Sequence, residues 1–161
     1  MAPIAPRRGS GVAAGCSGTE GAVAATTSLV ALDPKALTDE VRSFLRQRHV
    51  ATLTLLRPDG TPHVTPVGFT WDDAAGLVRV ITWSGAVKSK LLTRTGGGPA
   101  SVCQVDGGRW LTLEGNAVVT ADPDRCADAV RRYAARYSPP KDRGADRRAI
   151  EITVTRMMGR A

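Results

Sequence analysis

The sequence predicts a mainly β (α+β) domain, in which six antiparallel strands form a closed or partly open barrel with two or three short helices. Three observations predict this class. Segments with strand periodicity outnumber those with helical periodicity, the connections between successive strands are short, and closure into a barrel removes exposed strand edges. At 161 residues the chain is long enough for one domain with a substantial core.

The start of the chain is predicted to be a disordered extension over residues 1–32, so that the folded domain spans 33–161. Ala, Gly, Ser and Thr dominate this extension, and it has few large apolar side chains to bury. The composition changes at Asp33-Pro34. Apolar residues then recur at helical spacing over 37–45, and Thr38 is a suitable N-cap, which predicts a helix over about 38–48.

Three strands are predicted next. Residues 50–56 are rich in branched side chains, and Arg57-Pro58-Asp59-Gly60 is typical of a turn. The returning strand is predicted at 63–71, followed by a turn at 72–76 and an alternating strand at 77–83. Three antiparallel strands in succession indicate a meander.

The second half of the chain predicts two more helices and three more strands. A helix over 86–94 should stop at the breaker cluster Gly96-Gly97-Gly98-Pro99. The remaining predictions are strands at 100–105 and 109–120, a helix opening at Asp122-Pro123, a polar loop at 138–148 and a final strand at 149–157.

Composition restricts the possible partners. The net charge is +7 and aromatic residues are only 4% of the chain, so anions are attracted but a stacking platform for single-stranded nucleic acid is not indicated. We therefore expect no nucleic-acid partner. No apolar run approaches the roughly 20 residues of a membrane helix, so no membrane span is expected. Three cysteines without a paired spacing predict no disulfide and no metal site, and favour a cytoplasmic protein.

The sequence contains little material for catalysis by side chains alone. It has no Gly-rich phosphate loop of Rossmann or Walker spacing, and only two histidines, His49 and His63. A borrowed cofactor is therefore expected. The most suggestive segment is 81–90, where a strand leads into a short helix whose N–H groups and lysines could hold a phosphate. The alternative is that these lysines are merely solvated, and that Trp110 is a core residue.

Taken together, these segments resemble the pyridoxamine-phosphate-oxidase-like split barrels, and within them the deazaflavin-dependent branch. The resemblance covers about residues 36–157. It is carried by residues 48–53, 59–64, 66–69, 79–82, Lys88, 104–107, 109–115 and 132–137. It implies a homodimeric split β-barrel of the FMN-binding type, with a cofactor site completed by the second protomer.

The resemblance also implies which residues bind the cofactor. The redox ring would lie against the strand that begins at His63, near the main chain of Pro66, Val67 and Gly68. The phosphate-bearing tail would be held by a second group of residues, and the other protomer would contribute a third. The second group is Ile81, Thr82, Trp83, Lys88 and Ser89, and the third is Gln104 and Trp110. No catalytic proton donor can be named.

The implied activity is transfer of a hydride from reduced coenzyme F420 to a conjugated acceptor. A tetrapyrrole, biliverdin, is the preferred acceptor, with Arg109 and Lys141 available for its carboxylates. Val87 stands where related flavin-phosphate oxidases usually carry an arginine, and no Arg-x-His pair follows His63. Oxidation of pyridoxamine phosphate is therefore not expected. The alternatives are an FMN-dependent oxidoreductase, a non-catalytic F420 carrier and a basic nucleic-acid-associated protein.

Overall fold

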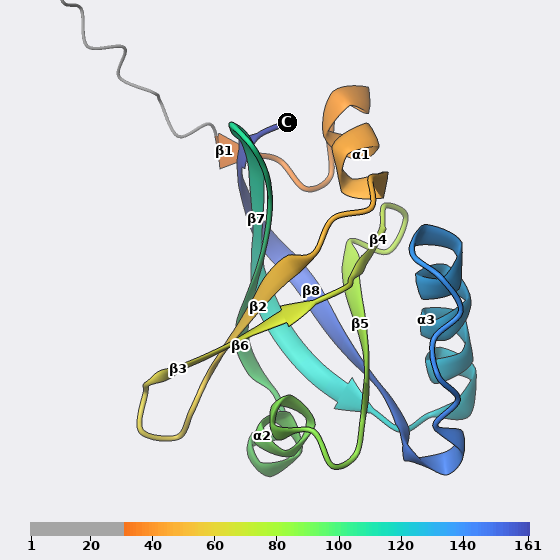
Figure 1. Ribbon diagram of the computed structural model, residues 1–161. Helices are drawn as coiled ribbons and strands as arrows, with labels where there is room; N and C mark the ends of the chain where they lie inside the picture. Colours follow the sequence, from red (N-terminus) through yellow and green to blue (C-terminus); the bar gives the residue numbers. More distant parts are fainter. Residues whose placement is uncertain (1–30) are drawn as a thin grey trace, which may run out of the picture.

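The computed structural model describes residues 31–161, which form one antiparallel sheet with three helices around it (Figure 1). The predicted extension falls almost wholly on residues 1–30, outside the described residues; its last two residues form a short strand that pairs with the end of the chain. The strands are β1 (Ala31–Leu32), β2 (Ala51–Leu56), β3 (Pro62–Val67), β4 (Thr70–Asp72), β5 (Leu77–Trp83), β6 (Gly98–Asp106), β7 (Arg109–Thr120) and β8 (Arg147–Arg160).

The strands pair in the order β3-β2-β6-β7-β8-β5-β4, with β1 on β8, and every pairing is antiparallel. The sheet curls into a barrel, but its first and last strands, β3 and β4, are not paired with each other. The barrel is therefore open between them. This arrangement confirms the predicted mainly β split-barrel class, while the count of eight strands corrects the predicted six.

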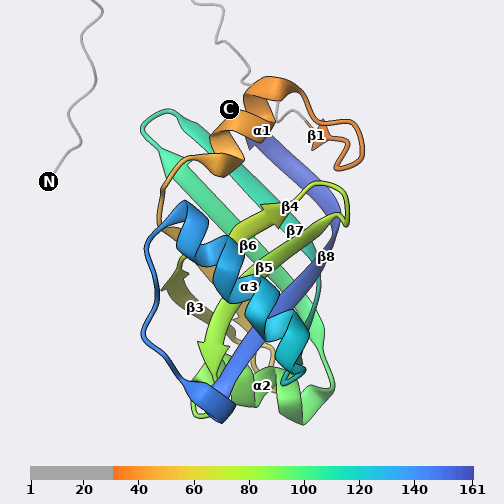
Figure 2. The same cartoon turned by 90° about the vertical axis from the view of Figure 1, so that its right-hand side faces the viewer.

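The helices are α1 (Asp39–Arg46), α2 (Val87–Thr95) and α3 (Pro123–Arg136), with a short 3-10 turn, η1, at Gly144–Asp146. Figure 2 shows α3 lying across β5 and β8, with α1 and α2 at opposite ends of the barrel. The predicted caps are present: the Thr38 hydroxyl accepts from the N–H of Val41, and Asp122 accepts from the N–H of Arg125. Gly96, at φ 70°, ends α2 as predicted.

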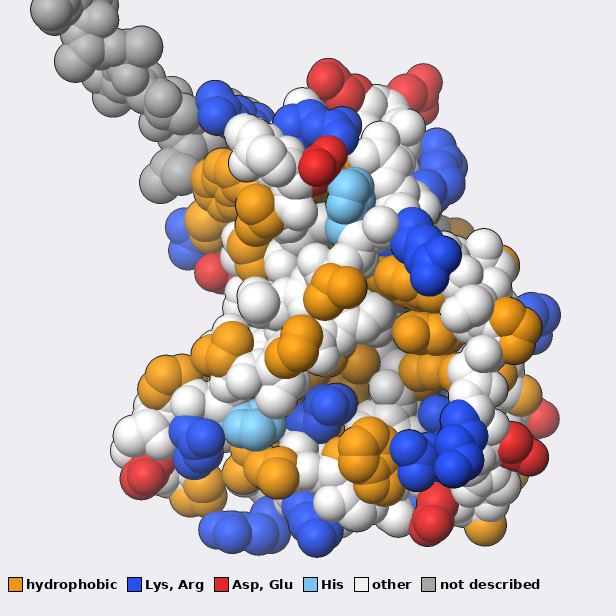
Figure 3. All heavy atoms as spheres, viewed as in Figure 1, with side chains coloured by type: hydrophobic (Ala, Val, Ile, Leu, Met, Phe, Trp, Pro, Cys, Tyr) orange, Lys and Arg blue, Asp and Glu red, His pale blue; other side chains and the backbone are white. Residues whose placement is uncertain are grey.

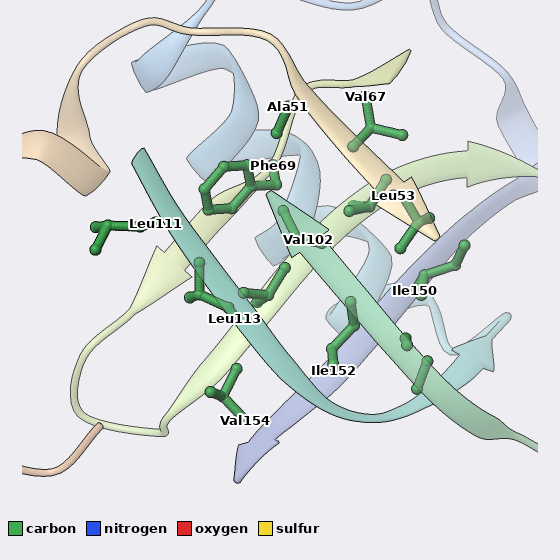
Figure 4. Close-up of a cluster of buried hydrophobic side chains, with 14 of the residues drawn as sticks. Ala51, Leu53, Val67, Phe69, Val102, Leu111, Leu113, Ile150, Ile152 and Val154 are labelled. Carbon is green, nitrogen blue, oxygen red and sulfur yellow. The ribbon is translucent and has the colours of Figure 1, made fainter. Parts of the chain in front are cut away.

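The core fills the inside of the barrel, where alternate residues of the strands meet (Figure 4). Leu53, Val102, Leu111 and Leu113 are all fully buried, and Ile152 of β8 lies among them. Burial of side chains of this size contributes about 1.5–3 kcal/mol each to folding. The apolar residues therefore determine which face of each strand points into the barrel. Polar side chains on that same face must also point inward.

The predicted strand at 63–71 is wrong as a continuous element, because it is interrupted at Gly68-Phe69 and continues as β4. The polar groups of this break are bonded to α3 instead of to a strand. The N–H of Phe69 donates to the hydroxyl of Tyr137 at 3.2 Å, and its carbonyl accepts from Arg136 at 2.6 Å. The last strand also begins two residues earlier and ends three residues later than predicted, and the polar loop before it contains η1.

A cluster of ion pairs fastens α3 to the sheet. Arg79 of β5 donates to Asp72 at 2.7 Å and lies 3.6 Å from Glu151 of β8. Arg132 of α3 reaches Asp72 at 3.0 Å, and Asp128 lies 3.5 Å from Arg79. Because these charges are largely shielded from solvent and compensate one another, loss of one partner would be costly. The cluster fixes α3, whose Arg136 and Tyr137 bind the main chain of the break at Gly68-Phe69.

Candidate functional site

Several buried polar atoms point into the barrel without a hydrogen-bond partner. His63 and Thr65 of β3 pair with Leu55 and Leu53, whose side chains are buried, so both face inward. His63 Nε2, Thr65 Oγ1 and Thr82 Oγ1 of β5 are buried and have no partner. Burying an unsatisfied polar group costs about 1–3 kcal/mol, so such a group needs an explanation. We name His63, Thr65, Thr82 and the adjacent Lys88 the inner cradle.

The inner cradle is electropositive. Lys88 of α2 is half-buried, and this burial lowers the pKa of its ammonium. It forms no ion pair with a carboxylate anywhere in residues 31–161. Burial also lowers the pKa of His63, with further lowering from the charges of Arg57 and Lys88. The site is therefore suited to an anion, which would compensate the Lys88 charge.

The helix that carries Lys88 adds to this property. Its N-cap is Ala86, which offers no side-chain hydrogen bond to the first turn. Main-chain N–H groups at a helix start favour negative charge. Figure 3 shows basic side chains across the lower part of this face, between the β3 hairpin and the η1 loop, with hydrophobic groups among them. The anionic end of a ligand therefore fits best near the start of α2.

Trp83 borders the inner cradle, next to Lys88, and is 39% exposed. The ammonium of Lys88 lies 5.8 Å from the ring centroid, and the guanidinium of Arg143 lies 4.7 Å from it. Cation–π contacts of this kind keep both cations beside the ring. The η1 loop is held there because the Ser84 hydroxyl donates to Asp146 at 2.9 Å. The sequence did not predict a role for Arg143 beside Trp83, because the two residues are 60 positions apart and no local pattern connects them.

The other predicted tail residues point in different directions. Thr82 is part of the inner cradle. The side chain of Ile81 points to the opposite face of the sheet and packs on Cys126, Ala129 and Ala149 beneath α3. Ser89 is buried and lines a separate cavity of about 670 Å³ beside the end of β7. The side chains that line this cavity include three cations and no carboxylate; the cations are Lys90, Arg94 and Arg148.

The predicted ring position lies at the β3–β4 break. Pro66 is exposed and Val67 is buried, and Gly68 follows them against α3. A Cβ atom on Gly68 would lie 2.7 Å from the ring of Tyr133 and 3.1 Å from that of Tyr137. Only glycine therefore allows the main chain to approach the two stacked tyrosines this closely. The tyrosines make a flat wall behind the break.

The residues predicted for the second protomer do not join the inner cradle of their own chain. Gln104 is fully buried in the same cross-strand row as Ala51 and Val67. Its amide donates to the carbonyl of Phe44 at 2.8 Å and accepts from Arg136 at 2.7 Å. Because both polar ends of its side chain are bonded within the chain, Gln104 has a structural role here. Trp110 pairs with Val105 on the outer face of the sheet and is partly exposed.

The two predicted substrate residues are also apart from the inner cradle. The guanidinium of Arg109 lies 4.7 Å from the ring centroid of Phe44, donates to Gln47 at 3.1 Å and pairs with Asp106. Lys141 is exposed on the loop before β8, and its carbonyl accepts from Arg147. The exposed Lys141 has no ion-pair partner among residues 31–161, whereas Arg109 is paired with Asp106.

Across the described part of the chain, no helix is both long and apolar enough to cross a membrane. No grouping of three or more His, Cys, Asp or Glu side chains suited to a metal ion occurs there either.

Comparison with known proteins agrees with the resemblance in the motifs. A relative named for dependence on reduced F420, a biliverdin reductase of Mycobacterium tuberculosis, is 46% identical over 125 residues, which are 78% of this chain and 89% of the relative. A structure described as an F420 reductase has a TM-score of 0.60 at 22% identity, covering 75% of this chain and 98% of that one.

Another similar structure shows the same fold. It is that of a conserved hypothetical protein of Mycobacterium tuberculosis, with a TM-score of 0.64 at 21% identity, covering 78% of this chain and 85% of that one. The family described as pyridoxamine 5'-phosphate oxidase matches residues 37–160, which is nearly the whole described domain. With its split barrel, the chain belongs to this family.

Proposed function

We propose that the protein is an oxidoreductase that uses reduced coenzyme F420. The single observation that carries this proposal is the inner cradle, in which Lys88 has no carboxylate partner and three buried polar atoms have no hydrogen-bond partner within residues 31–161. The name of the 46% identical relative supports F420 as the cofactor. When bound, reduced F420 supplies a hydride; the protein binds it, orients it and excludes water.

The described residues fit this cofactor. Lys88 and the start of α2 suit a phosphate, and the main chain at Pro66, Val67 and Gly68, backed by the stacked tyrosines, suits a planar ring. The cavity beside Ser89, with Lys90, Arg94 and Arg148, suits further negative charge along a tail. FMN has one phosphate and needs a compact site, which Val87 supplies less well than an arginine would. F420 is therefore preferred over FMN.

Biliverdin is the proposed acceptor, because the relative is named for it. A tetrapyrrole is planar and carries carboxylates, so the exposed Lys141 and the basic η1 loop are suitable partners. The test is oxidation of reduced F420 by purified protein with biliverdin, followed by absorbance. Turnover above the protein-free rate supports biliverdin, and its absence, with F420 still bound, removes biliverdin but keeps the cofactor.

We also propose that the protein acts as a homodimer through the outer face of the sheet. On this face Leu56 is exposed at one end of β2, next to Val64 of β3, and Val105 of β6 is exposed near the other end, beside the partly exposed Trp110 of β7. Exposed apolar side chains on one face favour association. Sedimentation at micromolar concentration is expected to give twice the chain mass, and Val64→Glu should give the monomer. A parent protein that sediments as a monomer would contradict the proposal.

Titration with F420 and with FMN tests the proposed cofactor directly. Quenching of F420 fluorescence with a dissociation constant at least tenfold lower than that for FMN is expected. A purified protein that contains bound flavin and leaves F420 fluorescence unchanged would favour the FMN-dependent alternative.

A further inference from the structure

Arg136 of α3 carries a largely buried guanidinium, and within the described residues it donates hydrogen bonds to neutral acceptors only. Its Nε and Nη2 donate to the carbonyl of Gln47 at 3.0 and 2.6 Å, and Nη2 also donates to Gln104 at 2.7 Å. Nη1 donates to the carbonyl of Phe69 at 2.6 Å. The guanidinium lies 4.4 Å from the ring centroid of Phe69 and 5.2 Å from that of Tyr137.

No carboxylate in residues 31–161 forms an ion pair with Arg136. Asp106, two residues beyond Gln104 on β6, is paired with Arg109 and lies 3.8 Å from His49. Other titratable groups around this position are Tyr137, whose hydroxyl bonds the His49 carbonyl, and Tyr133, stacked on it at 4.8 Å. The nearby Arg48 adds a further positive charge.

An arginine in such surroundings keeps its charge. Burial lowers the pKa of Arg136, but a guanidinium starts from so high a value that it remains protonated at neutral pH. Burying a charge without a counter-charge is costly unless something compensates it. A neutral amide could satisfy some of the same carbonyls, so hydrogen bonding alone does not account for a cation here.

The position of Arg136 suggests what compensates it. One carbonyl that Arg136 binds belongs to Phe69, directly after Gly68. Its guanidinium also stacks on Phe69 and on Tyr137, and Tyr137 is one of the two tyrosines that line the β3–β4 break. This is where the proposed function places the redox ring. A negative charge on a ring at the break would lie near the main chain that Arg136 binds, in surroundings that screen charge less than water does.

We propose that Arg136 is a positioning residue of the ring site, which fixes the Gly68-Phe69 main chain and whose uncompensated charge makes the site favour the anionic form of the bound ring over the neutral form. The inference rests on the proposed function. The pyrimidine part of a reduced deazaflavin has an N–H beside carbonyl groups and can ionise. The charge of Arg136 therefore lowers the pKa of this ring on the protein.

The test is an absorbance titration with pH of reduced F420 bound to the full chain under anaerobic conditions. Bound to the parent protein, the ring is expected to ionise at least one pH unit below free reduced F420, a tenfold preference for the anion. Arg136→Gln should remove most of this shift. Arg136→Lys should retain it, even where loss of the guanidinium fork weakens binding of both forms.

The matched control is Arg131→Gln, which removes a 72% exposed charge from the same helix and should leave the pKa of the bound ring unchanged. A purely structural role for Arg136 predicts that Arg136→Gln weakens binding of both ring forms equally and leaves the bound pKa unchanged, which overturns the proposal. The parent protein supplies a test that needs no variant, because an unshifted pKa there also overturns it. If the parent binds neither form, the proposed function itself fails.

Discussion

The N–H of Phe69 and the hydroxyl of Tyr137 are joined by a hydrogen bond of 3.2 Å, although the two residues are 68 positions apart. The same hydroxyl donates to the carbonyl of His49 at 2.8 Å. One side chain of α3 therefore ties together the end of the α1 segment and the break between β3 and β4. Burial raises the pKa of this phenol, so it stays protonated and able to donate at physiological pH.

Replacement of this tyrosine should loosen the break. Tyr137→Phe leaves the Phe69 N–H and the His49 carbonyl without their partner, and we expect the free energy of unfolding to fall by about 1–3 kcal/mol. Urea denaturation measures this effect. Phenylalanine at Tyr133 provides the control, because its hydroxyl has no such pair of main-chain partners among the described contacts. Equal stability of Tyr137→Phe and the parent would mean that these bonds contribute nothing net.

Gly68→Ala tests the close approach of the main chain to the tyrosine wall. The added Cβ would lie 2.7 Å from the ring of Tyr133, so the ring or the strand must move. Overpacking of this kind costs about 1–3 kcal/mol of stability, and displacement of the break should weaken F420 binding. Thermal unfolding and fluorescence titration measure the two effects. The double variant Gly68→Ala/Tyr133→Leu shortens the obstructing side chain and should restore part of the stability and part of the F420 affinity. If neither is restored, Tyr133 is not the obstruction.

The limits of prediction from sequence follow from the same contacts. The cap at Thr38, the stop at Gly96 and the start at Pro123 are local signals, and the structure confirms them. The break at Gly68-Phe69 depends on Arg136 and Tyr137, which no local pattern connects to it. The fold class could therefore be predicted from the sequence. The division of the predicted strand at 63–71 into β3 and β4 could not.

The directions of some side chains could be predicted to a similar degree. Strand alternation accounts for the inward direction of His63 and Thr82, which the resemblance had implied as cofactor-binding residues together with Lys88; their binding role stays a prediction. Gln104 could not be recognised as a core residue, because its amide partner, the carbonyl of Phe44, is 60 positions away. Arg143 reaches Trp83 only because η1 folds back on β5. Contacts between distant segments decide these cases, and they lie outside any window of local pattern.

Lys88→Ala should weaken F420 binding by about 1–3 kcal/mol, because it removes a charge-assisted contact to the anionic end of the ligand. Fluorescence titration measures the dissociation constant, which should rise about five- to 150-fold. Lys35→Ala is the control, since Lys35 is an exposed lysine before α1. An unchanged constant for Lys88→Ala would place the anionic end of the cofactor elsewhere.

Val87→Arg tests why F420 is preferred over FMN. Val87 is 56% exposed at the first position of α2, so a longer side chain can be accommodated without repacking the core. An added guanidinium beside Lys88 should strengthen a compact phosphate site, and FMN affinity should rise about tenfold by a gain of ~1.4 kcal/mol. Titration of the parent protein and of Val87→Arg, each with F420 and with FMN, measures the ratio of the two affinities. A gain of the same size for Val87→Lys would show that charge alone is responsible, without the bidentate geometry of arginine.

Stability and F420 binding should both depend on pH through His63. Protonation of its imidazole lowers the stability of the fold but accompanies binding of an anion. Burial first, and then the charges of Arg57 and Lys88, hold the pKa of His63 in the folded protein below its ordinary value of about 6.5. Above that value the imidazole is neutral in both states and its contribution does not change with pH. As pH falls below about 6.5, the unfolded chain takes up a proton before the folded one, so stability decreases towards the folded pKa. His63→Asn should remove this part of the loss, measured as the difference in free energy of unfolding between the parent and His63→Asn over pH 7 to 5.

An anion bound beside Lys88 should raise the pKa of His63 again. F420 binding near pH 6 is therefore expected to take up protons in the parent protein and fewer in His63→Asn. Calorimetry in buffers of different ionisation enthalpy measures this uptake, and identical uptake by both proteins would show that His63 does not face the anion.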